Sequence, residues 1–283
     1  MLDADHFESL RPRLKRLAYR MLGSWSEAED AVQDAYLRLS AAPEARKLEA
    51  LARTTVARLC LDRLKSARAQ REVYVGEWLP EPVLDRLLFP DHDPLGQLEH
   101  QASLAYGMLV LMERLRPEER VVFVLREALS LSYREVSDIL GKAEAGCRQL
   151  MVKARKQLEG PLPAGNFAAP ALEKLVMALQ AGDAGALSQL LGVQAVSVSD
   201  GGGKAAAAIH PIQGAQKIIA FLLGLARKAP PGLSSRLVEC NGQACLLLLQ
   251  DGVLITAFLP QLKEGLIEQL YIMRNPDKLG ALF

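Results

Sequence analysis

Apolar positions in the first part of the chain follow the spacing of amphipathic helices. Residues 5 to 22 carry an apolar stripe that predicts a first helix, which Gly23 ends. A second helix is predicted to begin near Ser26, because Ser26 and Glu29 have the spacing of a capping box. Its apolar face comprises Ala28, Ala31, Val32, Ala35 and Leu39. A third helix is predicted from about 48 to 69, with inward-facing Leu51, Thr55, Leu59 and Leu64.

Further along, the pattern predicts two helices joined by a tight turn. Pro117 suits the first position of a preceding helix, and Ser132 with Glu135 forms another capping box. Gly141 supplies the turn, and a basic helix follows Ala143, a residue whose side chain has no oxygen to cap it. A helix, a glycine turn and a basic helix are typical of a helix-turn-helix DNA-binding unit.

The last third of the chain changes to an apolar, nearly neutral pattern. It predicts two short helices broken at Gly182, a strand, a glycine turn, a second strand and a helix. Three more strands follow, joined at Asn241–Gly242 and Asp251–Gly252, which favour hairpins, and a last strand precedes the tail. This order predicts an α+β domain in which a curved antiparallel sheet wraps on helices.

Two proline-containing stretches divide the chain. The first stretch, the linker at 73–100, contains too many apolar residues to stay in water, so part of it is expected to dock on a neighbouring domain. We therefore predict a multidomain protein with two all-α domains and one α+β domain. The expected divisions are a domain at 1–72, a linker at 73–100, a helix-turn-helix domain at 101–160, a linker at 161–169 and a domain at 170–283.

Charge and cysteine content narrow the function classes. The net charge is only +1, but basic residues gather between 46 and 71 and between 142 and 156, as expected for contacts with nucleic-acid phosphates. The four cysteines show no zinc spacing, so we expect buried thiols in a reducing cytoplasm and no metal site or cofactor. The charged N-terminus and the lack of a long apolar run predict an intracellular chain that does not enter a membrane.

The segment AEDAVQDAYLRL resembles the core-polymerase-binding helix of extracytoplasmic-function (ECF) sigma factors of the sigma-70 family. The resemblance implies an alternative sigma factor that directs promoter-specific transcription initiation. It implies binding to core RNA polymerase at the beta-prime clamp helices and the beta flap. It implies polymerase contacts at Glu29, Asp30, Gln33, Asp34, Tyr36 and Leu37.

TTVARLCLDRLKSARAQRE resembles the helix of the same family that melts the promoter and recognises the −10 element. In the family the preceding loop, SAAPEARKLEA here, lies where a flipped base is read; relatives often carry an aromatic residue at the place of Ala50, so strand opening is expected to be weaker or to use another side chain. The implied −10 contacts are Arg53, Arg58, Arg63, Lys65 and Arg68.

LSYREVSDILG and CRQLMVKARKQL resemble the −35-binding domain of this family. We expect Arg148 and Gln149 to reach base edges, because Arg suits guanine and Gln suits adenine. Phosphate contacts are expected from Lys153, Arg155 and Lys156.

The last domain resembles SnoaL-like, cone-shaped domains of the NTF2-like superfamily, and WLPEP, DGGGK and NPDKL resemble motifs of sigma factors with such a fused domain. We expect this domain to pack on the first two and to modulate them intramolecularly. The expected regulatory contact includes Trp78, Leu79, Pro80, Asp200, Gly201, Gly202, Gly203, Lys204, Asn275, Pro276 and Asp277.

Two other readings stay open. A stand-alone helix-turn-helix regulator would explain residues 101–160 but not AEDAVQDAYLRL. A SnoaL-like isomerase or cyclase would use Asp200 and His210, the only candidate acid and base; we expect local hydrogen bonding there and no catalysis. A monomer is expected, and the sequence names no residue for a small ligand in the last domain.

Overall fold

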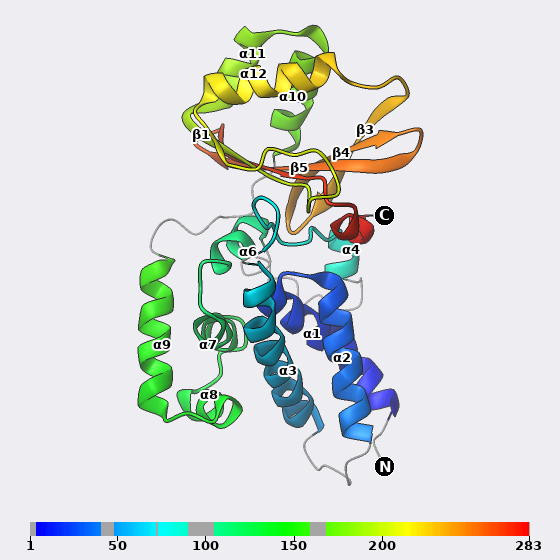
Figure 1. Ribbon diagram of the computed structural model, residues 1–283. Helices are drawn as coiled ribbons and strands as arrows, with labels where there is room; N and C mark the ends of the chain where they lie inside the picture. The colour runs from blue at the N-terminus through cyan, green and yellow to red at the C-terminus, as the bar shows by residue number, and fades with distance from the viewer. Residues whose placement is uncertain (1–3, 41–47, 72, 90–104, 159–167, 283) are drawn as a thin grey trace. The chain divides into compact units, whose positions relative to one another are not determined.

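The computed structural model describes residues 4–40, 48–71, 73–89, 105–158 and 168–282. These form two compact units (Figure 1). The described first unit contains α1 (Ala4–Leu22), α2 (Trp25–Ser40), α3 (Leu48–Arg71), most of α6 (Tyr106–Met112), α7 (Pro117–Glu127), α8 (Tyr133–Leu140) and α9 (Glu144–Gln157). The second contains residues 73–89, here called the strap, residues 105–107 and everything from residue 168 onward.

The first two helices confirm the apolar pattern, with one correction at the start of α2. Gly23 ends α1 with a left-handed φ of 71°. The cap of α2 is Ser24, whose Oγ accepts the amide hydrogen of Glu27 at 3.2 Å, so the prediction of a cap at Ser26 was wrong. Ser24 and Glu27 have the same spacing as Ser26 and Glu29, and Glu29 is engaged with Lys15 instead.

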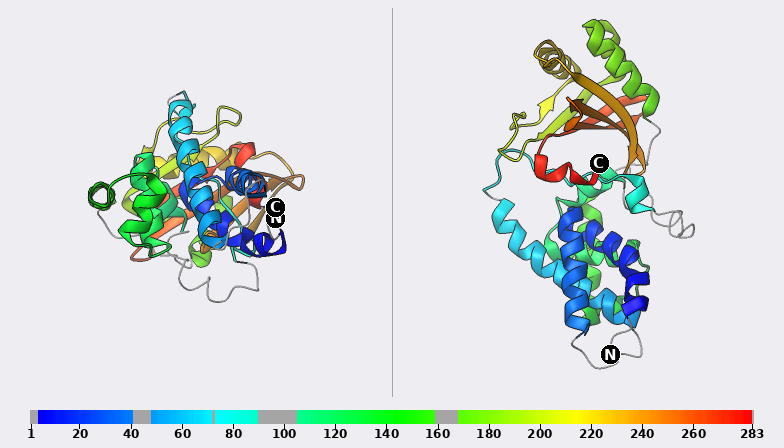
Figure 2. Two further views of the ribbon diagram at one scale, coloured as in Figure 1. Left: turned by 90° about the horizontal axis from the view of Figure 1, so that it is seen from below. Right: turned by 90° about the vertical axis from the view of Figure 1, so that its right-hand side faces the viewer.

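Helix α3 lies against α1 and α2, with its buried stripe shifted from the predicted one (Figures 1 and 2). Leu51 was expected inside but is 38% exposed, whereas Ala52 and Val56 are fully buried. Leu59 and Leu64 are buried as predicted. A one-residue shift turns a helix by roughly 100°, which sequence periodicity alone does not resolve near a helix start.

The caps of α7, α8 and α9 follow the sequence closely. Pro117 is the first residue of α7, and Ser132 and Glu135 form the predicted capping box of α8. Gly141 ends α8 in the left-handed conformation that the tight turn requires. Ala143 precedes α9 without a side-chain cap, as expected.

The described part of the second unit contains a six-stranded sheet in the order β2-β1-β6-β5-β4-β3. Its strands are β1 (Leu191–Asp200), β2 (Ile212–Gln213), β3 (Leu233–Cys240), β4 (Gln243–Gln250), β5 (Val253–Lys263) and β6 (Leu266–Met273). The sheet is mixed, not wholly antiparallel as expected, because β1 pairs with β6 in parallel. After β2, α12 carries the chain to the opposite edge of the sheet, where β3 begins, and β6 reaches β1 only after β4 and β5. Hairpin signals between neighbouring strands do not reveal this crossover.

Three helices cover one face of this sheet and form its main core (Figures 1 and 2). They are α10 (Ala169–Ala181), α11 (Ala184–Leu190) and α12 (Ala215–Arg227). Gly182 separates the first two, as predicted, and the hairpins turn at Asn241–Gly242 and Asp251–Gly252, all four residues having positive φ. The α+β class is therefore confirmed.

The strap and the C-terminus cover part of the other face. The strap contains α4 (Asp85–Leu88), and the C-terminal end forms two 3₁₀ turns, η1 (Pro276–Lys278) and η2 (Gly280–Leu282). Leu79, Val83 and Leu88 of the strap are at most 1% exposed. Part of the first proline-containing stretch thus packs within the second unit, which agrees with the expectation that part of it docks.

Candidate functional site

Helix α2 presents the candidate polymerase-binding residues in two groups. Asp30, Gln33 and Leu37 are exposed at positions i, i+3 and i+7, which place them on one face, and Leu37 is 56% exposed. Gln33 accepts a hydrogen bond from Arg11 at 3.2 Å, and the other three candidates are also engaged inside the unit. Glu29 pairs with Arg11 at 3.0 Å and Lys15 at 2.5 Å, Asp34 pairs with Arg63 at 2.6 Å, and Tyr36 packs its ring on Phe7.

Most candidate −10 residues on α3 already bind protein groups. The guanidinium of Arg58 donates Nε to the Ile139 carbonyl at 2.9 Å and Nη2 to the Asp138 carbonyl at 2.7 Å. Both carbonyls belong to the last turn of α8, where the helix dipole favours a cation. Arg53 lies 3.9 Å from Glu135, and Lys65 lies 3.7 Å from Glu118.

The remaining −10 positions divide between described and undescribed residues. Arg63 binds Asp34 and donates to the Glu27 carbonyl at 2.7 Å, so it braces α2. The side chain of Arg68 and residues 41–47 of the loop SAAPEARKLEA lie outside the described residues.

Helix α9 exposes all five candidate −35 residues. Arg148 and Gln149 lie in the second turn of α9, Lys153 lies about one turn further along, and all three are exposed. Arg155 pairs with Glu127 at 2.8 Å, and Lys156 is exposed. Val152, 67% exposed on the same stretch, was not singled out from the sequence because a lone valine in a helix normally signals core.

Tyr133 is a second residue that sequence reasoning missed. Its ring has the Arg126 guanidinium at 4.4 Å and the Arg148 guanidinium at 4.8 Å from its centroid. Glu144 binds Arg148 from one turn away at 2.9 Å. Arg148 is therefore held between an aromatic face and a carboxylate before any DNA is present.

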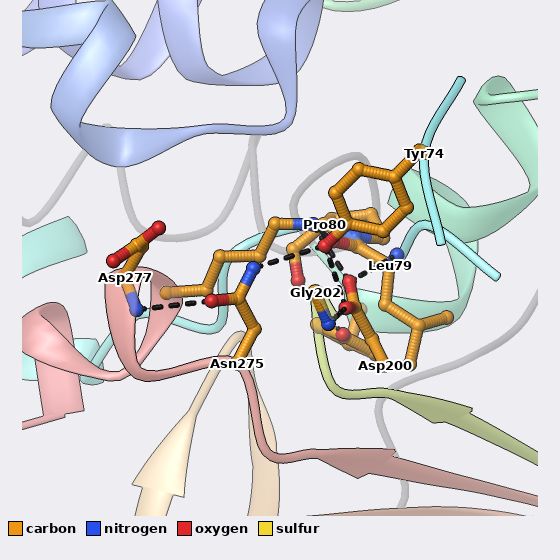
Figure 3. Close-up of polar contacts among 9 residues, drawn as sticks. Tyr74, Leu79, Pro80, Asp200, Gly202, Asn275 and Asp277 are labelled. Atoms are coloured by element: carbon orange, nitrogen blue, oxygen red, sulfur yellow. Dashed lines mark hydrogen bonds and ion pairs between the residues drawn. The ribbon is translucent and has the colours of Figure 1, made fainter. Parts of the chain in front are cut away.

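The WLPEP, DGGGK and NPDKL motifs meet within the second unit around Asp200 (Figure 3). The buried Asp200 carboxylate accepts hydrogen bonds from the Tyr74 hydroxyl at 2.7 Å, the Leu79 amide at 2.9 Å and the Gly202 amide at 2.9 Å. Its fourth donor is the Lys278 ammonium at 2.7 Å. We call Tyr74, Leu79, Asp200, Asn275 and Lys278 the Asp200 cluster.

Lys278 completes this cluster from the C-terminal end. Its ammonium also donates to the Leu79 carbonyl at 2.7 Å and lies 3.9 Å from the ring centroid of Trp78. Asn275 donates to the Tyr74 hydroxyl at 2.9 Å and accepts the Asp277 amide at 3.1 Å. Burial, followed by the hydrogen bond to Asp200, raises the pKa of Tyr74.

The other predicted regulatory residues surround this cluster. Pro80 accepts a hydrogen bond from the Tyr106 hydroxyl at 2.8 Å, and Lys204 pairs with Asp277. Gly202 has a φ of 60°, and a Cβ there would collide with the Asn275 side chain, which explains a glycine at this point of DGGGK. Tyr74 and Lys278 were not predicted individually, although Lys278 lies inside the NPDKL motif.

The arrangement does not present Asp200 as an acid or base. Its two oxygens are shared by four donors, and His210 is exposed. Cys60, Cys147, Cys240 and Cys245 are buried free thiols, as expected, and burial raises the pKa of Cys60 to about 12. Among the described helices, none is long and apolar enough to cross a membrane.

Known proteins match both units. Residues 6–70 match Sigma-70 region 2, and residues 108–158 match Sigma-70, region 4. The chain is 35% identical to the "ECF RNA polymerase sigma factor SigJ" of Mycobacterium tuberculosis, over 98% of this chain and 93% of that protein. The crystal structure of SigJ covers 99% of both chains with a TM-score of 0.78 and 33% identity. A "Probable ECF RNA polymerase sigma factor SigI" of the same species is 34% identical over 52% of this chain and 51% of its own length.

Proposed function

The chain belongs to the ECF RNA polymerase sigma factors, which bind core polymerase and promoter DNA to direct transcription initiation, and we propose how its residues divide these tasks. We infer that the exposed face of α2, made by Asp30, Gln33 and Leu37, docks on the clamp helices of the beta-prime subunit. The observation that carries this assignment is the exposure of these three side chains, with Gln33 accepting one hydrogen bond from Arg11, whereas Glu29 and Asp34 bind cations of their own unit. We propose that the helix-turn-helix domain binds the beta flap of the polymerase. We also propose that the protein acts in the cytoplasm.

Core binding tests the α2 assignment. Leu37→Ala should weaken binding of the full chain to core polymerase by about tenfold, because an exposed leucine at the centre of an interface is expected to contribute more than 1 kcal/mol. Leu225→Ala, which shortens an exposed leucine on α12, is the matched control and should leave affinity unchanged. Equal affinities of both variants would move the docking surface away from α2.

For the −35 element we propose that α9 enters the major groove, with Arg148 and Gln149 at base edges and Val152 against a thymine methyl group. Lys153, Arg155 and Lys156 then neutralise phosphates. Tyr133 acts as a positioning residue, since it stacks on Arg148 without reaching the bases itself.

A double-mutant cycle tests the role of Tyr133. Tyr133→Ala should reduce discrimination between the preferred −35 base pair and a substituted one by about two- to fivefold, the size of an exposed cation–π contact. Tyr133→Phe keeps the ring and should retain discrimination. In an Arg148→Ala background, Tyr133→Ala should have no further effect; a full additional loss would show that Tyr133 acts only by stabilising the fold.

For the −10 element we propose that Arg53 and Arg58 of α3 bind the promoter only after α8 releases them. Arg58 cannot hold a phosphate with the same N–H groups that now bind the Asp138 and Ile139 carbonyls.

We further propose that the second unit modulates the sigma domains within the same chain. The support is the Asp200 cluster, which ties the strap, the segment that follows α3, to the end of β1 and to the C-terminal turn η1. Run-off transcription with core polymerase should differ between the full chain and a chain ending near residue 165. Identical transcript yields at matched occupancy of polymerase would remove this regulatory proposal.

A further inference from the structure

A pocket of about 430 Å³ lies between the strap and the sheet of the second unit. Leu247 of β4 and Val238 of β3 form part of its floor, and Leu84 of α4's N-terminal flank and Leu282 of η2 form part of its walls. Leu247 alternates with Leu246, which belongs to the core under the helices. The pocket therefore opens on the face of the sheet opposite α10, α11 and α12, where Figure 1 shows α4 and the C-terminus.

The pocket combines an apolar interior with a charged border. Arg86 of α4 and Arg236 of β3 border it, and neither guanidinium has a hydrogen bond or an ion pair within the described part of the chain. The acids at the border are Asp85 and Glu239. The Asp85 Oδ1 accepts the Gly242 amide at 2.9 Å, so within the described residues the two guanidiniums share the border with one carboxylate that has no hydrogen bond, that of Glu239. Two uncommitted guanidiniums beside an apolar floor are suited to a carboxylate on an apolar body.

We propose that this pocket binds a small amphipathic carboxylate, whose apolar body lies on Leu247 and Val238 and whose head group is held by Arg86 and Arg236. The pocket volume fits a ligand of the size class that protein pockets of this kind enclose. The sequence alone does not indicate these residues as a ligand site, because Arg86 and Arg236 are far apart in the chain and meet only through the docked strap.

The position of the pocket links such a ligand to the strap. Leu84 donates its amide to the Ala281 carbonyl at 3.1 Å and bridges to Cys240, so the pocket walls exist only while this end of the strap is docked. A carboxylate that binds the docked form stabilises it relative to the undocked form. This step rests on the regulatory part of the proposed function, whereas binding itself does not.

Displacement of a fluorescent amphipathic anion, anilinonaphthalene sulfonate, from the full chain tests the proposal. Three competitors share one apolar chain and differ in head group: decanoate, decanol and decylamine, each below its micelle concentration. Decanoate should compete about tenfold better than decanol, the size expected of one charge-assisted hydrogen bond, and decylamine should compete worst. Equal competition by all three, or a preference for decylamine, overturns the assignment.

Variants at the border and floor locate the site. Arg86→Gln and Arg236→Gln should each remove most of the preference for decanoate over decanol while leaving decanol competition intact. Val238→Trp should fill the pocket and abolish competition by all three compounds. The control is Leu237→Trp, since Leu237 pairs with Leu246 and points to the other face. Decanoate competition that survives Val238→Trp would place binding elsewhere.

A separate measurement tests the link to the strap without polymerase. In a Trp25→Phe chain, Trp78 of the strap is the remaining tryptophan. Saturating decanoate should lower the quenching of Trp78 fluorescence by acrylamide at least twofold. The Val238→Trp variant is not used in this assay. Decanoate that binds without changing Trp78 quenching would refute the coupling and leave the site standing, and neither result depends on transcription.

Discussion

Arg58 in the first unit and Lys278 in the second make the same kind of contact in opposite surroundings. Each is a cation that donates to backbone carbonyls, those of Asp138 and Ile139 for Arg58 and that of Leu79 for Lys278. Arg58 is exposed and has no carboxylate in its contact, whereas the Lys278 side chain is 11% exposed and is paired with the fully buried Asp200.

This difference decides what can replace each contact. A DNA phosphate can reach Arg58 and offer it a full negative charge in place of two carbonyl dipoles. Lys278 has no comparable alternative, because moving it into water would leave the Asp200 carboxylate buried without its counter-charge. We infer that the α3–α8 contact exchanges during promoter binding, whereas the Asp200 cluster holds the strap as a lasting part of the second unit.

The largest expected effect comes from breaking the buried contact. Asp200→Asn keeps the shape of the side chain but leaves the Lys278 ammonium without an opposite charge, which should cost about 3 to 5 kcal/mol of unfolding free energy. Urea unfolding of the full-length Trp25→Phe chain, followed by Trp78 fluorescence, measures it. The control Asp277→Asn removes only an exposed ion pair with Lys204 and should cost less than about 1 kcal/mol. Equal costs would show that burial does not distinguish these contacts.

Alkaline pH should sharpen the same comparison. The pKa of Tyr74 is raised in the folded chain, chiefly by burial and then by Asp200, so above about pH 10 the unfolded chain loses a proton that the folded chain keeps. Stability contributed by protonated Tyr74 is therefore complete below this pH and declines as pH rises further. The slope of unfolding free energy against pH reports how many more protons the folded chain binds than the unfolded chain. Between pH 10 and 11, Tyr74→Phe should lower this difference by about one proton. An unchanged slope would contradict the assignment.

Much of this architecture follows from local signals in the sequence. The capping box at Ser132, the turn at Gly141 and the Asn241–Gly242 hairpin depend on a few neighbouring residues, and each forms as predicted. The α2 cap at Ser24 and the exposed Leu51 are misses by one or two positions within a helix, whereas the larger misses involve tertiary partners. The parallel pairing of β1 with β6 and the encounter of Tyr74 with Asp200 join segments far apart in the chain. For Arg58, the basic pattern predicts a surface cation but not the α8 carbonyls that receive it.

The smallest expected effect concerns a second exposed contact of α3 in the first unit, with Glu118 of α7. Glu118 lies 3.7 Å from Lys65 and 3.2 Å from Lys142, and all three side chains are partly exposed. Glu118→Gln should free Lys65 and remove a charge that repels phosphate, raising affinity for a fluorescent duplex about two- to threefold at low salt. The gain should vanish near 1 M salt, where screening is short-ranged. Glu8→Gln, which breaks the exposed pair with Arg11, is the control. If both variants gain equally, net charge alone explains the effect, and Glu118 does not restrain α3.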